Sequence, residues 1–264
     1  MRSVVMGLVA AVCWLQAASA QDDAKLLDVL VAAYPDHLER HDGGVLIWKD
    51  GTRMVFDEGE RQKDFEALLG RPSLKDQFYA PYPVGQAPVP PSLNIDPGRV
   101  RHQAFFAKMY GDCRKGEVVR QLVDVVWLPR KWGRTLKVTR VNGVAAKLAA
   151  VSAELDKLPA RFDEYLFPPA GTFNCRAIAG TERVSPHGLG IAIDIATARS
   201  HYWHWTKPDG AGRYPYRNAI PMEIVDIFER HGFIWGGRWY HYDTMHFEYR
   251  PEVIAAWRLG KGGT

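Results

Sequence analysis

Residues 185–194, SPHGLGIAID, constrain the fold more than any other part of this 264-residue chain. The segment places His187 before two glycines and ends in an alternating apolar strand that carries Asp194. Fully extended, the seven residues from His187 to Asp194 would span about 23 Å. Gly188 and Gly190 permit the chain to turn back, so the two polar side chains can approach each other.

Asp194 needs a partner, because burying an unpaired carboxylate in an apolar strand costs free energy. His246, in DTMHFEY, completes a set of two histidines and one carboxylate, which can bind zinc and leave a fourth position for water. The alternatives are core histidines that are satisfied by other groups and a salt bridge of Asp194. His201 and His204 are a weaker candidate ligand pair, because they lie in an aromatic segment that resembles a loop.

Composition and motifs exclude several classes of function. The chain has 34 basic and 30 acidic residues, a net charge of +4 and no long run of like charges, so nucleic acid is not an expected partner. Gly-x-Ser-x-Gly and Ser-x-x-Lys are absent, which disfavours serine acylation. His-Glu-x-x-His and Cys-x-x-Cys are absent as well, which excludes the zinc sites that those motifs form.

The first twenty residues are typical of a secretory signal peptide. Arg2 is followed by an apolar stretch over residues 4–15 and by the small residues Ala18-Ser19-Ala20 before Gln21. The apolar stretch is shorter than the roughly 20 residues of a membrane-spanning helix. We therefore expect cleavage before Gln21, a periplasmic or secreted protein, and no stable membrane anchor after cleavage.

Export also changes what the cysteines can do. Without Cys13 in the leader, the chain retains Cys113 and Cys175. An even number of cysteines in an oxidising compartment allows one disulfide. Two buried thiols are the alternative.

Local patterns indicate an α+β protein with a small antiparallel sheet, flanking helices and the zinc site. Helical spacing covers residues 24–34, 100–111, 145–158 and 221–232, and strand patterns cover 45–56, 118–128, 136–141, 191–195, 232–237 and 245–250. The first strand pattern is a hairpin with its turn at Asp50-Gly51, and residues 79–97 are rich in proline. We divide the chain into a signal peptide (1–20), an N-terminal α+β region with a Pro-rich linker (21–97) and a catalytic domain (98–264).

The two motifs, SPHGLGIAID and DTMHFEY, resemble those of the zinc D-alanyl-D-alanine carboxypeptidase family, which includes L-alanyl-D-glutamate endopeptidases. The shared pattern is Ser-x-His-x-x-Gly-x-Ala-x-Asp followed by a carboxylate-x-x-His. The upstream FNCRAIAGTERVS is similar to the arginine-bearing segment of the family, and the resemblance covers about residues 165–252. The matching residues are Ser185, His187, Gly190, Ala192, Asp194, Asp243 and His246, with Arg176 at the arginine.

The resemblance implies a role for each matching polar residue. His187, Asp194 and His246 would bind Zn²⁺, and Asp243 would be the general base, with Glu248 as the competing candidate. Arg176 would stabilise the charge that develops on the substrate, unless it forms a structural salt bridge. The candidate substrate-binding residues are Ser185 and the aromatic residues Trp203, Trp239 and Tyr242, for which core packing is the alternative.

The resemblance and the leader together imply an exported zinc peptidase that acts on peptidoglycan stem peptides. The sequence leaves open whether the enzyme is a D-Ala-D-Ala carboxypeptidase or an L-Ala-D-Glu endopeptidase. A zinc-containing cell-wall-binding module without catalytic activity is the alternative function.

Overall fold

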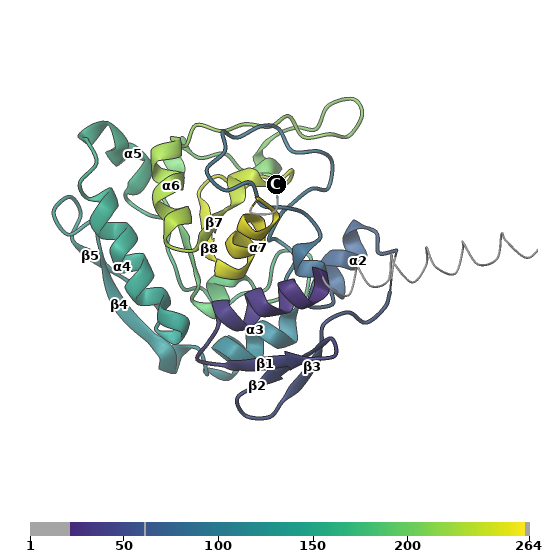
Figure 1. Cartoon of the computed structure of the whole chain (residues 1–264). Helices are drawn as coiled ribbons and strands as arrows, with labels where there is room; N and C mark the ends of the chain where they lie inside the picture. The colour runs from purple at the N-terminus through teal and green to yellow at the C-terminus, as the bar shows by residue number, and fades with distance from the viewer. Residues whose placement is uncertain (1–21, 61, 262–264) are drawn as a thin grey trace, which may run out of the picture.

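The computed structural model describes residues 22–60 and 62–261, so the expected signal peptide lies outside the described residues. The α+β class is confirmed: helices pack around three separate antiparallel sheets, with the strand orders β1-β2-β3, β4-β5 and β6-β8-β7 (Figure 1). The division at residue 97 remains a prediction.

The N-terminal region begins with a helix over residues 22–33. A three-stranded meander follows, in which β1 (Leu38–Asp42) and β3 (Arg53–Val55) both pair with β2 (Val45–Trp48). The predicted hairpin is confirmed, and Gly51 in its turn has a φ of +82°, which favours glycine. Helix α2 (Phe65–Gly70) comes next.

The Pro-rich segment, residues 79–97, contains no helix or strand, as expected. Buried side-chain hydrogen bonds attach it to the C-terminal half. The hydroxyl of Tyr82 donates to Glu229 at 2.6 Å, and the backbone N–H of Gly85 donates to the same carboxylate at 2.8 Å. The segment therefore packs against the rest of the molecule over part of its length.

Helix α3 (Gln103–Tyr110) begins later than the sequence pattern suggests. His102 is its N-cap, and its Nδ1 accepts a hydrogen bond from the N–H of Phe105. Pro97 lies before the first turn of this helix, because the side-chain cap at His102 sets the start of the helix.

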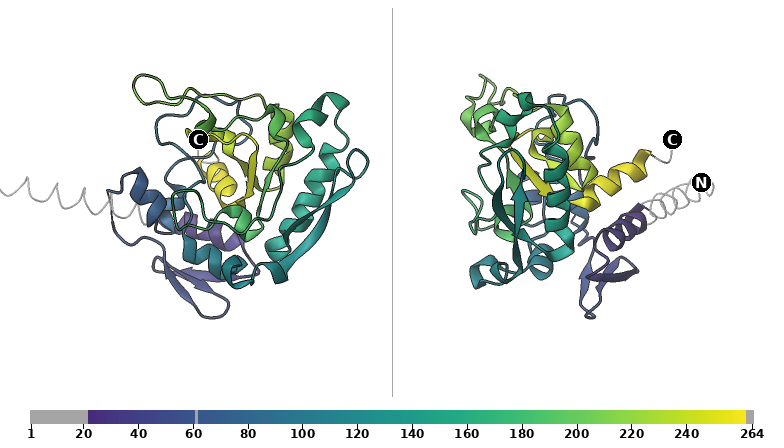
Figure 2. Two further views of the ribbon diagram at one scale, coloured as in Figure 1. Left: turned by 180° about the vertical axis from the view of Figure 1, so that it is seen from behind. Right: turned by 90° about the vertical axis from the view of Figure 1, so that its left-hand side faces the viewer.

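A long hairpin with a helix packed on it forms one edge of the molecule in Figures 1 and 2. Strand β4 (Leu122–Trp127) pairs with β5 (Arg134–Thr139), and α4 (Val144–Leu155) packs against both strands. The short helix α5 (Asp163–Leu166) follows.

The third sheet lies in the C-terminal half and holds most of the motif residues. Strand β8 (His246–Tyr249) is central, between β6 (Ala192–Asp194) and β7 (Phe233–Trp235). Helix α6 (Met222–Arg230) packs on β7.

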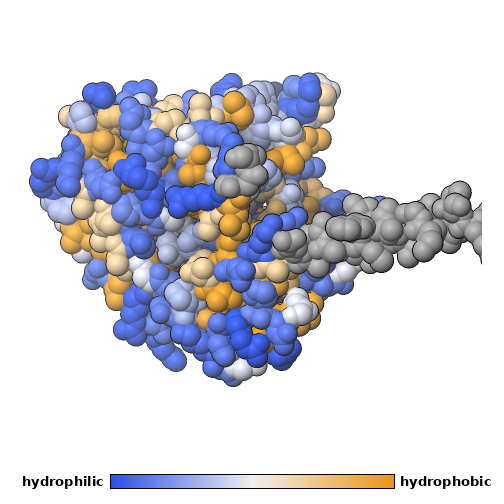
Figure 3. Space-filling view, viewed as in Figure 1, coloured by the Kyte–Doolittle hydropathy of each residue, from blue (hydrophilic) through white to orange (hydrophobic). Residues whose placement is uncertain are grey.

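Helix α7 (Pro251–Lys261) follows β8 and also contacts β7. One hydrophobic cluster joins residues of the N-terminal helix, the hairpin and this sheet, from Leu27 to Tyr249. On the face in Figure 3, hydrophobic residues are interspersed among hydrophilic ones. Within the described part of the chain, no helix has the length and apolar character needed to span a membrane.

Candidate metal centre and its cleft

His187, Asp194 and His246 are brought together by a tight reversal and a strand pair. His187 lies in a 3₁₀ turn (Pro186–Leu189) that begins with Ser185 as its N-cap. The turn ends at Gly190, whose φ of +69° favours glycine. After this reversal β6 runs antiparallel to β8, and Asp194 lies directly opposite His246 in the register.

The three candidate ligand atoms converge on one point. Nε2 of His187 lies 3.2 Å from Nδ1 of His246, and Oδ1 of Asp194 lies 3.2 Å from the former and 2.9 Å from the latter. Ligands about 2 Å from a tetrahedral zinc ion are about 3.3 Å apart. The residues therefore fit such an ion.

The outer nitrogen of each histidine is held by an acceptor. Nδ1 of His187 donates to the backbone carbonyl of Thr172 at 2.5 Å, and Nε2 of His246 donates to Glu248 at 3.1 Å. When the imidazoles are neutral, these bonds place the ring proton on the outer nitrogen, so both inner nitrogens present lone pairs. Two lone pairs and a carboxylate oxygen repel each other at this distance unless a proton or a metal cation lies among them, and such outer-shell bonds are typical of metal-binding histidines.

The electrostatics of this cluster also favour positive charge at its centre. Burial opposes a charge on His246, but its hydrogen bonds to Asp194 and Glu248 raise its pKa to about 10. Burial likewise opposes the charge on Asp194, yet hydrogen bonds from His187 and His246 lower the pKa of this carboxyl. The same negative field that attracts a proton attracts a metal cation.

Glu248 is a fully buried carboxylate whose two oxygens are both occupied. Nη1 of Arg101 lies 3.1 Å and 3.0 Å from them, and Nη1 of Arg250 lies 3.2 Å from Oε1. Although burial raises the pKa of Glu248, the charge of Arg101 and the hydrogen bond from His246 lower it to about 2. This carboxylate is therefore ionised, and both of its oxygens already accept hydrogen bonds.

Asp243 differs from Glu248, because one of its oxygens has no partner. Its Oδ1 is buried and, among the described residues, makes no hydrogen bond. Burial raises the pKa of Asp243 to about 6, and the charge of Asp194 acts in the same direction. The backbone N–H of Asp243 donates to Gly236 at 3.0 Å. A β-carbon on Gly236 would lie 2.5 Å from the carbonyl oxygen of Asp243, so only glycine fits there.

The candidate metal cluster, His187, Asp194 and His246, lies in a cleft that most of the predicted site residues line. Trp239 contributes one wall, with its ring 5.7 Å from that of His246. Trp203 packs against His204 and His241 on the rim. The predicted residues in the cleft are Arg176, Ser185, His187, Asp194, Trp203, Trp239, Asp243 and His246.

Tyr242, also predicted to bind substrate, does not line this cleft. Its side chain is fully buried, and its hydroxyl bonds to Thr206 and to the carbonyl of Pro215. The structure thus places Tyr242 beneath the loop that follows residue 205, where it anchors that loop and does not line the cleft. Of the alternative histidine pair, His204 reaches the rim, but the metal-competent cluster of the described residues contains neither His201 nor His204.

Several functional contacts were not apparent in the sequence. Arg101 pairs with Glu248 across 147 residues of chain, and Asp96 accepts hydrogen bonds from Arg99 and from the ring of His241. No local motif marks these residues. Arg99 is close to Asp96 in the sequence, but Glu248 lies 147 residues from Arg101 and His241 lies 145 residues from Asp96. Of these residues, His241 lies nearest to a recognised motif, two residues before DTMHFEY.

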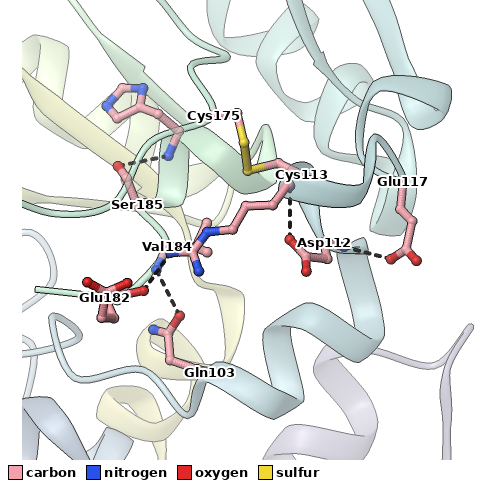
Figure 4. The surroundings of a disulfide bond; sticks show 10 residues. Gln103, Asp112, Cys113, Glu117, Cys175, Glu182, Val184 and Ser185 are labelled. Atoms are coloured by element: carbon pink, nitrogen blue, oxygen red, sulfur yellow. Dashed lines mark hydrogen bonds between the residues drawn. A yellow bond between two sulfur atoms is a disulfide. The ribbon is translucent and has the colours of Figure 1, made fainter.

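A disulfide joins Cys113 to Cys175, the pair considered in the sequence. Figure 4 shows it beside the chain that leads through Val184 to Ser185. Arg176 follows Cys175 directly, and its carbonyl accepts a hydrogen bond from the N–H of Ser185. The disulfide therefore attaches the arginine-bearing segment to the short turn after α3.

Comparisons with known proteins agree with the local motif. Searches of the curated proteins and of the solved structures find no match to this chain. A family model described as D-alanyl-D-alanine carboxypeptidase matches residues 179–249, which include His187, Asp194, Asp243 and His246. This match confirms the predicted family for the segment that carries the metal cluster.

Proposed function

We propose that the chain is an exported, zinc-dependent peptidase that hydrolyses peptide bonds in peptidoglycan stem peptides. The family match supports a hydrolytic peptidase. The leader-like pattern in residues 1–20 supports export to the compartment where peptidoglycan lies. The cleft is compatible with a carboxypeptidase or an endopeptidase.

The convergence of three ligand atoms carries this proposal. His187, Asp194 and His246 would hold the ion, and the acceptors on the outer nitrogens keep both histidines in the ligating tautomer. When bound, zinc lowers the pKa of a coordinated water and polarises a carbonyl. Three protein ligands leave a position open for this chemistry.

Asp243 is the group that moves the proton. It would accept a proton from the attacking water at its unpartnered Oδ1. As the bond from water oxygen to carbonyl carbon forms and the C–N bond breaks, Asp243 would return the proton to the leaving amine. A carboxyl with a pKa of about 6 is largely ionised at neutral pH and can still donate a proton.

Glu248 is unsuited to that role and has another one. Its oxygens already accept hydrogen bonds from Arg101, Arg250 and His246. It orients the imidazole of His246 toward the centre. Arg176, exposed in the same cleft, would stabilise the negative charge that develops on the carbonyl oxygen.

Matched variants of the two carboxylates test the proposal on purified peptidoglycan. Asp243→Asn should retain bound zinc and lower the rate about 10²–10⁴-fold, the usual contribution of a general base. Glu248→Gln should weaken zinc binding about 10- to 100-fold, as loss of an outer-shell partner does. Mass spectrometry of the released fragments identifies the cleaved bond.

Three results would contradict these assignments. Normal hydrolysis by Asp243→Asn, together with an inactive Glu248→Gln protein that retains its zinc, would reverse the two roles. Full activity of both variants, or of the chelated wild type, would refute the mechanism. A zinc-loaded wild type that binds peptidoglycan and cleaves nothing would be a wall-binding module.

A further inference from the structure

Four arginine side chains contribute positive charge to the cleft. Arg99, Arg101, Arg176 and Arg183 all line it. Two of these cations are neutralised, since Arg99 donates to Asp96 at 2.5 Å and Arg101 pairs with Glu248. Arg176 is exposed and belongs to the proposed mechanism. Arg183 has neither such a partner among the described residues nor a role in the proposed mechanism.

The guanidinium of Arg183 is half-buried and lies near other cations. Among the described residues, its side chain makes no hydrogen bond or ion pair. Burial and the charges of Arg101 and Arg99 lower its pKa to about 10, and Glu66, which is exposed in the same cleft, opposes this shift. A cation in such a place gains free energy when an anion enters.

The backbone around Arg183 is held firmly, although its side chain is free. Its carbonyl accepts a hydrogen bond from the N–H of Ile178 at 2.8 Å, and its N–H donates to Thr181 at 3.2 Å. The next N–H, that of Val184, donates to Gln103 on α3 at 3.3 Å. The loop between the bridged residues Ala177 and Val184 therefore holds the backbone of Arg183 in place, and its guanidinium faces the cleft. A fixed backbone reduces the conformational entropy lost on binding.

We propose that Arg183 binds a carboxylate of the substrate that is not part of the scissile bond, and so selects acidic peptides. The inference rests on the proposed peptidase function and names a specificity-determining residue for it. A guanidinium matches the planar geometry of a carboxylate and forms charge-assisted hydrogen bonds with it. A C-terminal carboxylate and a side-chain carboxylate share this chemistry.

The test measures peptide binding separately from cleavage. Zinc-loaded full-length Asp243→Asn protein is titrated with three synthetic stem peptides by calorimetry. One peptide has both its C-terminal and its D-Glu α-carboxylate free, and each of the others has one of these groups converted to an amide. We expect one amidated peptide to bind about 10- to 100-fold more weakly, as loss of a charge-assisted hydrogen bond predicts. The peptide that loses affinity identifies the source of the carboxylate.

Variants then assign the effect to Arg183. Arg183→Gln in the same background should lower affinity for the acidic peptide to that for the sensitive amide, while affinity for the amide stays unchanged. Arg183→Lys should retain part of the preference. Arg120→Gln is the matched control, because Arg120 is exposed, lies outside the cleft and carries the same charge.

The outcomes separate this inference from the proposed function. Equal binding of the three peptides by the arginine-intact protein would overturn the inference, and this comparison needs no change at Arg183. An equal effect of Arg183→Gln on acidic and amidated peptides would also overturn it. If the acidic preference depends on Arg183 but the wild type cleaves no peptide, the inference stands and the peptidase proposal fails. If the wild type cleaves the peptides but shows no preference for acidic ones, the peptidase proposal stands and the inference about Arg183 fails.

Discussion

Arg101 and Glu248 form a fully buried ion pair beside the candidate metal ligand His246, with Nη1 of Arg101 3.0 Å from Oε2 of Glu248. The same oxygen accepts the hydrogen bond from Nε2 of His246. The orientation of a candidate zinc ligand therefore depends on a residue that precedes α3, outside the segment that matches the family.

Arg101→Gln should destabilise the protein by about 3–5 kcal/mol, because it removes a main counterion of a buried carboxylate. Urea unfolding of the zinc-free protein measures this loss. Arg213→Gln breaks an exposed ion pair with Asp209 and should cost less than about 1 kcal/mol. Similar losses in the two variants would show that Arg101 is not needed to neutralise Glu248.

Removal of a ligand should abolish metal binding. His187→Ala leaves two ligand atoms of the three, so zinc content should fall from about one ion per chain to near zero, and hydrolysis should be lost. His41→Ala removes a histidine that pairs with Asp28 far from the cleft and should change neither quantity. Unchanged zinc content in His187→Ala, measured by atomic emission, would refute the ligand assignment.

The disulfide should contribute both stability and activity. Its cysteines are 62 residues apart, and the chain-entropy account then gives about 4 kcal/mol. A Cys113→Ser/Cys175→Ser double variant should lose roughly this free energy of unfolding. It should retain zinc but hydrolyse more slowly, because Arg176 is released from its attachment. A rate equal to that of the wild type would mean that the backbone hydrogen bond from Ser185 holds Arg176 in place without the disulfide.

Gly236→Ala should displace Asp243 without touching the metal ligands. The added methyl would lie 2.5 Å from the carbonyl oxygen of Asp243, so the backbone there must shift. A displacement of about 1 Å can lower a rate about 10²-fold. Gly210→Ala is the control, because a β-carbon at Gly210 meets no atom within 4 Å. Equal rates for the two variants would show that the position of Asp243 is not critical.

Asp96 should attach the Pro-rich segment to the cleft in a pH-dependent way. It is fully buried, and although burial opposes its charge, the hydrogen bond from His241 and the charge of Arg99 lower its pKa. Because the folded value lies below that of the unfolded chain, about 3.9, the carboxylate adds stability above that pH and loses it as the pH falls through the folded value.

Asp96→Asn should therefore cost about 2 kcal/mol at pH 7 and progressively less below about pH 4. Thermal unfolding across this pH range measures the difference. Asp124→Asn, which breaks an exposed pair with Lys137, should have little effect at any pH. A penalty of Asp96→Asn that stays constant down to pH 2 would show that its ionised form is not what stabilises the fold.

The sequence alone determined the features that depend on neighbouring residues. The apolar spacing of α4 and α6, the hairpin turn at Gly51 and the reversal at Gly190 follow from local conformational preferences. The candidate ligands were also recognisable, because His187 and Asp194 lie within one short motif.

Only the tertiary structure decided which distant groups meet. Arg101 reaches Glu248, Thr172 holds His187, and Asp96 joins the Pro-rich segment to the rim through contacts between segments far apart in the chain. It also places the Arg183 side chain in the cleft with no hydrogen bond or ion pair to the described residues, and it places Tyr242 outside the cleft. Periodicity reports which face of an element is buried, but the partner of a buried charge depends on how whole elements pack. That information is absent from any local stretch of sequence.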